Sequence, residues 1–176
     1  MRGEPDGFGE FVLARSHALL RTAWMLTGDA QAAEDLLQTA LARTWPHWDR
    51  VGQGHPEAYV RTVMVRTNAS WRARLWNREQ PATDLMTEAG ATRVGEEGVP
   101  DGHGQVDDRL VLAGALAQLP VRQRQAVVLR YFDDLSVDAV AQIMGSSTGT
   151  VKSQTAKGLD KLRAVIGEDS LVEEEL

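Results

Sequence analysis

Residues 136–154 read SVDAVAQIMGSSTGTVKSQ and contain the strongest structural pattern in the chain. Four apolar residues recur there at i, i+3, i+4 and i+7, as on one face of a short helix: Val137, Val140, Ala141 and Met144. Ser136 precedes this helix at a capping position, and Gly145 follows it, where a tight turn with positive φ suits glycine. Ser147 can then cap a second helix that begins at Thr148.

This second helix has two different faces. Its inner face is apolar, with a small threonine in line: Val151, Thr155, Leu159, Leu162 and Ile166. Its outer face near the N-terminus is polar and basic: Thr150, Lys152, Ser153, Gln154 and Lys157. Two short helices joined by a glycine turn describe a helix-turn-helix, whose second helix enters the DNA major groove with its N-terminus first. The alternative is a helical hairpin in a bundle, with solvated polar residues.

The first half of the chain predicts three more helices. The first runs from about Phe8 to Leu26, and Asp29 can cap the second after the turn at Gly28. The second must end or bend before Pro46, and the glycines in residues 49–55 indicate a loop.

The third helix is expected to begin near Pro56, because proline suits the first turn. Its apolar stripe is predicted to face the core: Val60, Val63, Met64, Thr67, Trp71 and Leu75. Arg61, Asn68 and Arg72 line a neighbouring strip, so one helix offers a core face and a basic face together.

Residues 80–106 lack helical periodicity and are rich in glycine and carboxylates, which is typical of a mobile acidic linker. Helical patterning resumes at residues 107–118, breaks at Leu119-Pro120 and continues over residues 121–132. We therefore expect an all-α protein of two small helical domains joined by a flexible linker. The predicted limits are residues 1–79, the linker 80–106, residues 107–167 and an acidic tail, 168–176.

The net charge of −6 conceals two basic segments. Residues 55–78 hold five arginines against the single acidic residue Glu57, and residues 119–166 are also basic, whereas residues 79–118 between them are acidic. DNA affinity depends on local phosphate neutralisation more than on total charge. The pattern indicates two DNA-facing surfaces, with two solvated helix faces as the alternative.

Composition excludes several classes. The absence of cysteine excludes disulfides and thiolate metal sites, and the four histidines show no metal-ligand spacing. No apolar stretch is long enough to span a bilayer, and the N-terminus lacks the apolar run of a secretion signal. We expect a cytoplasmic protein without cofactor, metal or catalytic residues.

Three segments of the second half resemble region 4 of the extracytoplasmic-function (ECF) sigma factors, and of the actinobacterial SigE family in particular: Leu119-Pro120-Val121-Arg122-Gln123-Arg124, Val128-Leu129-Arg130-Tyr131 and Gly149-Thr150-Val151-Lys152-Ser153. Three segments of the first half resemble region 2 of the same family: Leu26-Thr27-Gly28-Asp29, Ala33-Glu34-Asp35-Leu36-Leu37-Gln38 and Pro56-Glu57-Ala58-Tyr59-Val60-Arg61. The two matches occur in the order that the family shows.

The resemblance implies a sigma factor that binds core RNA polymerase and directs promoter-specific initiation, not an enzyme. It implies that region 4 reads the −35 element through Arg130, Thr150, Lys152, Ser153, Gln154 and Lys157. It implies −10 recognition by Arg61, Arg66, Asn68 and Arg72. It assigns core binding, on the β′ clamp helices with the β subunit as a further contact, to Asp35, Gln38 and Arg43. An anti-sigma factor is a candidate partner, since such partners are common in the family.

The chain departs from the family pattern at two places. Thr39 stands where many members have Glu, which bears on affinity for the core enzyme. Arg66 stands where relatives commonly have Asn, which bears on the −10 sequence read. Trp71 and Trp76 suit base stacking, but Trp71 lies on the apolar stripe and favours a core role. Arg130 has the alternative of a solvated helix residue.

Two rival classes account for less of the sequence. An ordinary helix-turn-helix regulator would bind DNA without polymerase and would leave the segment around Asp35 and Gln38 unexplained. A helical enzyme would need a partnered nucleophile or a metal set, and the sequence offers neither.

Overall fold

The computed structural model describes the backbone of residues 5–78 and 103–173, and the side chains of residues 5–75 and 110–167. All the regular structure in these ranges is helical, which confirms the all-α prediction. The elements follow in this order: α1 (Phe8–Thr27), α2 (Ala30–Thr44), η1 (Trp45–His47), α3 (Trp48–Val51), α4 (Pro56–Arg78), α5 (His103–Ala117), α6 (Val121–Val127), η2 (Val128–Phe132), α7 (Val137–Met144) and α8 (Thr148–Glu173).

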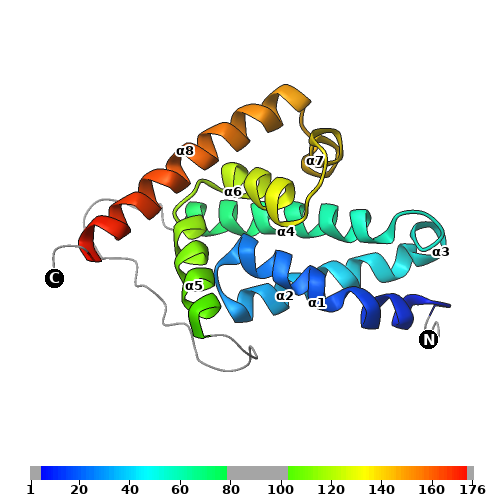
Figure 1. Cartoon of the computed structure of the whole chain (residues 1–176). Helices are drawn as coiled ribbons and strands as arrows, with labels where there is room; N and C mark the ends of the chain where they lie inside the picture. The colour runs from blue at the N-terminus through cyan, green and yellow to red at the C-terminus, as the bar shows by residue number, and fades with distance from the viewer. Residues whose placement is uncertain (1–4, 79–102, 174–176) are drawn as a thin grey trace.

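The turn between α1 and α2 has the predicted chemistry. Gly28 adopts φ 76°, which is strained for other residues, and its amide donates to the Trp24 carbonyl to close α1. Asp29 then caps α2, since its carboxylate accepts a hydrogen bond from the Ala32 amide at 2.7 Å. The two helices consequently pack as a pair beneath α4 (Figure 1).

The predicted loop over residues 49–55 is wrong in its first part, where α3 forms one helical turn. Trp48 and Val51 lie one turn apart on the same side of α3, and both are buried. The Trp48 ring meets Phe8 at 5.0 Å between centroids, and its indole N–H donates to the Asp6 carbonyl at 2.9 Å. Burial of these two apolar side chains explains the helical turn, and the glycines mark only its end.

The predicted linker, residues 80–106, lies largely outside the described residues, which resume at residue 103, and the last three residues of the predicted tail, 174–176, lie outside them too. Two boundaries nevertheless differ from expectation. Helix α5 begins at His103, inside the predicted linker, and α8 continues to Glu173, past the predicted tail boundary.

The helix predicted over residues 121–132 begins as α6 and widens into the π-type turn η2. The Asp133 amide donates to the Val128 carbonyl at 3.1 Å, five residues earlier, and the Leu135 amide donates to the Leu129 carbonyl. Wider turns of this kind interrupt the α-helical ladder and re-aim the residues that follow. Asp133 comes directly after this turn and faces the first half of the chain.

The helix-turn-helix is confirmed in its details. Ser136 caps α7 through the Ala139 amide at 3.1 Å. Gly145 adopts φ 61° between the two helices, and Ser147 accepts the Thr150 amide at 3.1 Å. Each sequence signal therefore performs the local role that its residue type suggests.

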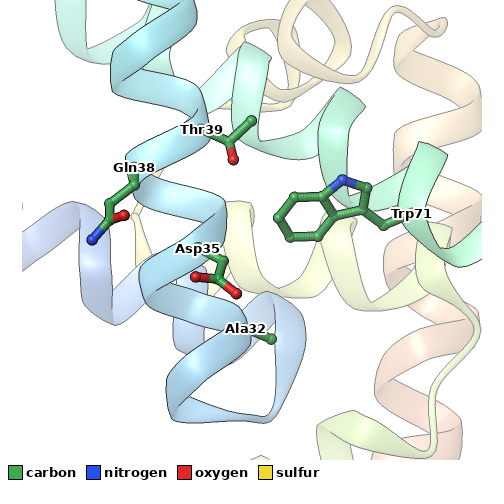
Figure 2. A pocket seen from close by; sticks show the side chains of 5 residues that line it. All are labelled: Ala32, Asp35, Gln38, Thr39 and Trp71. Atoms are coloured by element: carbon green, nitrogen blue, oxygen red, sulfur yellow. The ribbon is translucent and has the colours of Figure 1, made fainter.

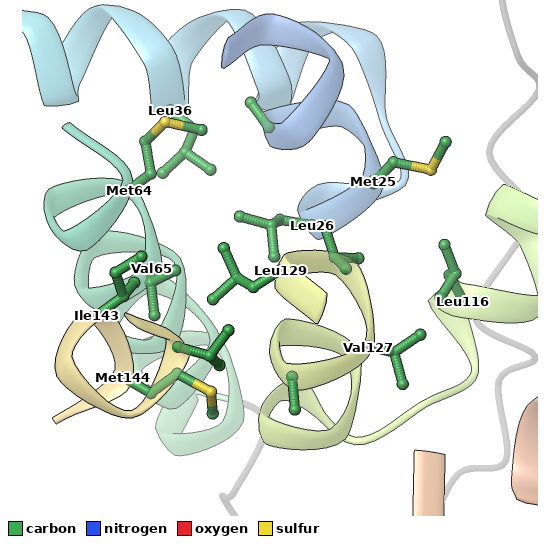
Figure 3. Packing of buried hydrophobic residues seen from close by; sticks show 14 of the residues in the cluster. Met25, Leu26, Leu36, Met64, Val65, Leu116, Val127, Leu129, Ile143 and Met144 are labelled. Atoms are coloured by element: carbon green, nitrogen blue, oxygen red, sulfur yellow. The ribbon is translucent and has the colours of Figure 1, made fainter. Parts of the chain in front are cut away.

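A single apolar core joins the two halves of the chain. Figure 3 shows Leu129 of η2 pointing between Leu26 of α1 and Val65 of α4, and Met144 of α7 packs in the same cluster. Helix α4 lies between the α1–α2 pair and the α6–α7 pair (Figure 1). Each half thus covers apolar surface of the other.

Helix α4 has more than the one predicted apolar stripe. Val60, Met64 and Thr67 are buried as expected, but Leu75 is 52% exposed, so its prediction is wrong. The opposite error concerns Asn68, which is only 4% exposed because the second half of the chain covers it. The spacing of apolar residues along a helix indicates one buried face of that helix. It does not indicate that a segment distant in sequence covers a second face.

Candidate DNA and polymerase interfaces

The N-terminal turn of α8 presents the predicted DNA-reading side chains. Thr150, Lys152, Ser153 and Lys157 are exposed, and Gln154 is half-buried. Val151, between them in sequence, is fully buried and anchors the turn in the core. The Ser147 hydroxyl holds both the amide of Thr150 and its hydroxyl, the latter at 2.9 Å. The turn therefore offers cations and polar groups on a rigid support, at the positive end of a helix dipole.

Close packing fixes α8 against α6. A Cβ atom at Gly158 would lie 2.7 Å from Cγ2 of Val127 and 3.2 Å from the Gln123 carbonyl oxygen. Thr155, one turn earlier, is buried and returns its hydroxyl to the Val151 carbonyl at 2.7 Å. The small residues allow the two helices to approach, so α6 sets the orientation of the turn that is predicted to read DNA.

Arg130 lies apart from the start of α8. It belongs to η2, and its guanidinium donates to the Leu135 carbonyl in the segment that leads into α7. The same guanidinium lies 5.9 Å from the centre of the Tyr131 ring. Arg130 is half-buried and is not simply a solvated helix residue.

The four residues predicted to read the −10 element do not form one exposed strip on α4. Arg66 is exposed and Arg72 is half-buried. The Arg61 side chain is only 11% exposed, since it pairs with Glu57 at 2.8 Å and with Asp133 at 3.0 Å. Asn68 is buried and accepts a hydrogen bond from Gln125 at 3.4 Å. The predicted basic face is thus partly covered by the second half of the chain.

Asp35 and Gln38 lie exposed on α2, beside an open hollow with a volume of about 520 Å³. Figure 2 shows Ala32, Asp35 and Thr39 on the side of α2 that faces the indole of Trp71, while Gln38 points away from that ring. The hollow therefore combines a carboxylate, a hydroxyl and an aromatic wall.

Trp71 and Arg43 border this surface in different ways. Trp71 is half-buried and packs against the core, which agrees with its predicted core role, yet it also lines the hollow. Arg43, further along α2, donates to the buried Thr67 hydroxyl at 2.9 Å and does not line the hollow.

Sequence reasoning missed the polar residues that join the two halves: Thr22, Arg124, Gln125 and Asp133. One signal was present, because Gln125 shares a helix face with Val121, Val128 and Leu129, where a polar residue is unusual. The contacts of Asp133 had no such signal, since its partners lie more than 70 residues away.

Arg124 is the one cation among these four residues, and it is only 2% exposed. Its guanidinium donates to the Leu26 carbonyl at 2.9 Å and to the Ala117 carbonyl, near the ends of α1 and α5. Burial, with the charge of Arg72 as a smaller cause, lowers the pKa of Arg124 to about 10. The group therefore remains protonated at neutral pH, and its charge interacts favourably with the carbonyl ends of two helices.

The described residues hold no cluster of His, Asp or Glu suited to a metal ion. Within the same ranges, no helix is both long and apolar enough to cross a membrane.

Comparison with known proteins places both halves of the chain. Residues 11–78 match the family model of sigma-70 region 2, and residues 109–162 match that of sigma-70 region 4. The RNA polymerase sigma-E factor of Streptomyces avermitilis is 39% identical over 92% of this chain and 86% of its own length. The ECF RNA polymerase sigma factor SigL of Mycobacterium tuberculosis is 32% identical over 85% of this chain and 83% of its own.

Solved structures share the fold. The sigma factor RpoE of Bartonella quintana, crystallised with the anti-sigma factor NepR, aligns with a TM-score of 0.67 at 22% identity, over 93% of this chain and 98% of that one. CnrH, in complex with the cytosolic domain of CnrY, aligns with a TM-score of 0.61 at 18% identity, over 92% and 88% of the two chains. With both regions matched in order, and with relatives along nearly the whole length, the chain belongs to the ECF sigma factors, the non-catalytic subunits that direct RNA polymerase to promoters.

Proposed function

We propose that this sigma factor reads the −35 element with the first turns of α8, reads the −10 element with α4 and binds the core enzyme through α2. The observation that carries the proposal is the exposed polar turn of α8, held by the Ser147 cap and the buried Val151. Residues 1–79 and 107–167 are the proposed limits of the two regions. The working site is the cytoplasm, where polymerase and chromosome are.

In the −35 complex, Lys152 and Lys157 reach guanine acceptors or phosphates, and Gln154 suits adenine. Thr150 and Ser153 are short donors that suit phosphate oxygens beside the helix N-terminus. Arg130 supports the motif at the entry to α7 and reaches DNA only if its bond to Leu135 exchanges for a phosphate.

In the −10 complex, Arg66 supplies a cation that is already exposed, whereas Arg72 lies with Arg61 and Asn68 on another side of α4. Arg61 and Asn68 complete the surface once the second half of the chain moves away. A surface that tracks single-stranded DNA needs cations to contact the backbone, and it gains affinity from nearby aromatic rings.

The hollow on α2 suits a basic side chain of the polymerase β′ clamp helices. The Asp35 carboxylate provides a charge partner, and the face of Trp71 provides a cation–π surface. Gln38 and Arg43 extend this contact along α2, and the β subunit is a further contact. Thr39 lines the hollow and leaves space there that a longer glutamate would occupy.

An anti-sigma factor is a further proposed partner. The RpoE structure that shares this fold is a complex of a sigma factor with an anti-sigma factor, and the CnrH structure is likewise a complex with a second protein. Size-exclusion chromatography with candidate regulators from the same genome tests this partner.

The decisive experiment mixes the purified chain with bacterial core RNA polymerase and a promoter library randomised at both elements. We expect transcripts from templates that share a −35 and a −10 motif. Lys152→Ala should reduce the sequence preference at the −35 element, and Arg66→Ala should reduce that at the −10 element. Lys161→Ala, which changes an exposed lysine further along α8, should leave both preferences unchanged. Sequence-independent transcription, or no stimulation of the core enzyme, would contradict the proposal.

A further inference from the structure

Asp133 ties the second half of the chain to two helices of the first. Its Oδ1 accepts a hydrogen bond from the Thr22 hydroxyl of α1 at 2.6 Å, and its Oδ2 accepts from Nε of Arg61 on α4 at 3.0 Å. The Asp133 side chain is 7% exposed. Glu57, one turn before Arg61, completes a cluster of charges at this seam. A buried, hydrogen-bonded carboxylate thus holds the seam between the regions.

Gln125 makes a second polar contact across the same seam. It is fully buried, and its amide donates to the Val65 carbonyl at 3.1 Å and to the Asn68 side chain at 3.4 Å. Arg124, its neighbour in sequence, reaches across to the carbonyl end of α1. Region 4 therefore matches the polar groups of region 2 as well as its apolar surface.

We propose that Asp133 latches the chain in a self-blocking arrangement, in which region 4 and the −10 DNA compete for one face of α4. The inference rests on the proposed −10 role of Arg61 and Asn68. Both side chains are engaged by region 4, Arg61 by Asp133 and Asn68 by Gln125, and neither is free to contact a nucleotide. Binding of the −10 strand then requires release of region 4.

The chemistry of the latch makes release reversible. When the seam opens, Asp133 becomes hydrated, and Arg61 keeps Glu57 as an intramolecular partner, so no charge is left buried and unpaired. A substitution that removes the Asp133 carboxylate destabilises the closed form instead, because Arg61 then stays in the closed seam with Glu57 as its remaining charge partner. The closed form is then selectively weakened, and the population shifts towards the open form.

Asp133→Asn tests the latch, with Asp134→Asn as a matched control. Asp134 is exposed and adopts φ 51°, a conformation that asparagine also tolerates. Because the chain has no cysteine, Leu13→Cys and Lys161→Cys on the exposed surfaces of α1 and α8 accept a specific donor–acceptor dye pair. We expect high energy transfer for the wild type and the control, and a shift to low transfer for Asp133→Asn. Identical distributions for the three chains would overturn the latch.

Binding of the −10 non-template strand gives the functional readout. The free Asp133→Asn chain should bind a single-stranded −10 oligonucleotide about tenfold more tightly than the wild type, and Asp134→Asn should not. Circular dichroism and thermal melting of both variants show whether they are folded. Equal affinity of two folded variants would contradict the competition.

A reversible lock provides an independent test. The Thr22 hydroxyl and the Asp133 carboxylate are 2.6 Å apart, so cysteines at these two positions lie near each other, and loss of both free thiols on oxidation shows that the disulfide has formed. The oxidised Thr22→Cys/Asp133→Cys chain should not bind the −10 strand or support transcription, and reduction should restore both. Undiminished −10 binding by the oxidised chain would overturn the proposal.

The two proposals fail in different ways. If Arg61→Ala in the assembled holoenzyme leaves the −10 motif unchanged, then the −10 assignment of Arg61 is wrong, whatever the dyes report. If that motif changes while energy transfer is the same in Asp133→Asn and wild type, then the assignment stands and the latch is wrong.

Discussion

Substitution of Gly158 by alanine should destabilise the protein, although alanine is the better helix former. Gly158 is buried where α8 crosses α6, and its new Cβ would lie 2.7 Å from Cγ2 of Val127. Val127 is itself 1% exposed, so it has little room to move. The second neighbour, at 3.2 Å, is the backbone oxygen of Gln123, which cannot change rotamer.

The size of the effect follows from two opposing contributions. Overpacking of a tight core costs about 1–3 kcal/mol. Loss of glycine from a helix interior returns about 0.5–1 kcal/mol. The midpoints of these two ranges leave a net loss of about 1 kcal/mol, which corresponds to a fall in Tm of about 2–4 °C for a chain of this size. Since α8 carries Lys152, the same strain should also weaken binding to a −35 duplex.

Gly114→Ala is the matched control for thermal melting. Gly114 lies in the last turn of α5 and is exposed, and a Cβ atom there would meet no other atom within 4 Å. Alanine at this position should therefore raise stability, by at most the gain of about 0.5–1 kcal/mol that applies to a helix interior. Val127→Ala removes the clashing methyl group but also loses buried apolar surface, so the variant Gly158→Ala/Val127→Ala should lose about 1–2 kcal/mol less than the sum of the two single variants. A Tm for Gly158→Ala at or above that of the wild type would refute the packing argument.

Three further predictions concern the proposed interfaces. Lys152→Ala should weaken binding of holoenzyme to a −35 duplex by about 1–3 kcal/mol in a titration, whereas Lys161→Ala should leave affinity unchanged; equal losses would point to a general charge effect. Asp35→Asn and Trp71→Ala should each weaken binding to core polymerase by about 0.5–2 kcal/mol in competition against a labelled sigma factor, and full affinity in both would remove the hollow from that interface. Ser147→Ala should cost about 1 kcal/mol in denaturant unfolding, and Ser147→Gly only a few tenths; similar losses would contradict the capping role.

Local features of this fold could be predicted from sequence because the residues that cause them are neighbours. Asp29, Ser136 and Ser147 each cap the helix that follows. Each side chain accepts a hydrogen bond from the backbone amide three residues later. Gly145 adopts the positive φ that ends α7. These signals need no knowledge of the remaining structure, since a cap satisfies backbone donors of its own helix.

The seam between the halves could not be predicted in the same way. The sequence pattern places Asn68 on an exposed face, whereas its burial depends on Gln125, 57 residues later. The position of Asp133 depends on the π-type turn η2, whose wider hydrogen bonds no periodic pattern indicates. The sequence therefore predicts the candidate site as a set of residues on helices, while the division into accessible and covered residues requires the tertiary structure.

The two proposed DNA surfaces are unequally available in this arrangement, and on the proposed assignments this difference would set the order of events at a promoter. The start of α8 is open, with Lys152, Ser153 and Lys157 exposed. On α4, by contrast, Arg61 and Asn68 are engaged by region 4. A closed chain can thus approach duplex DNA through region 4 before its −10 surface is free. If core polymerase binds region 2 through α2, as proposed, completion of the second surface requires release of both seam contacts, Asp133 from Arg61 and Gln125 from Asn68.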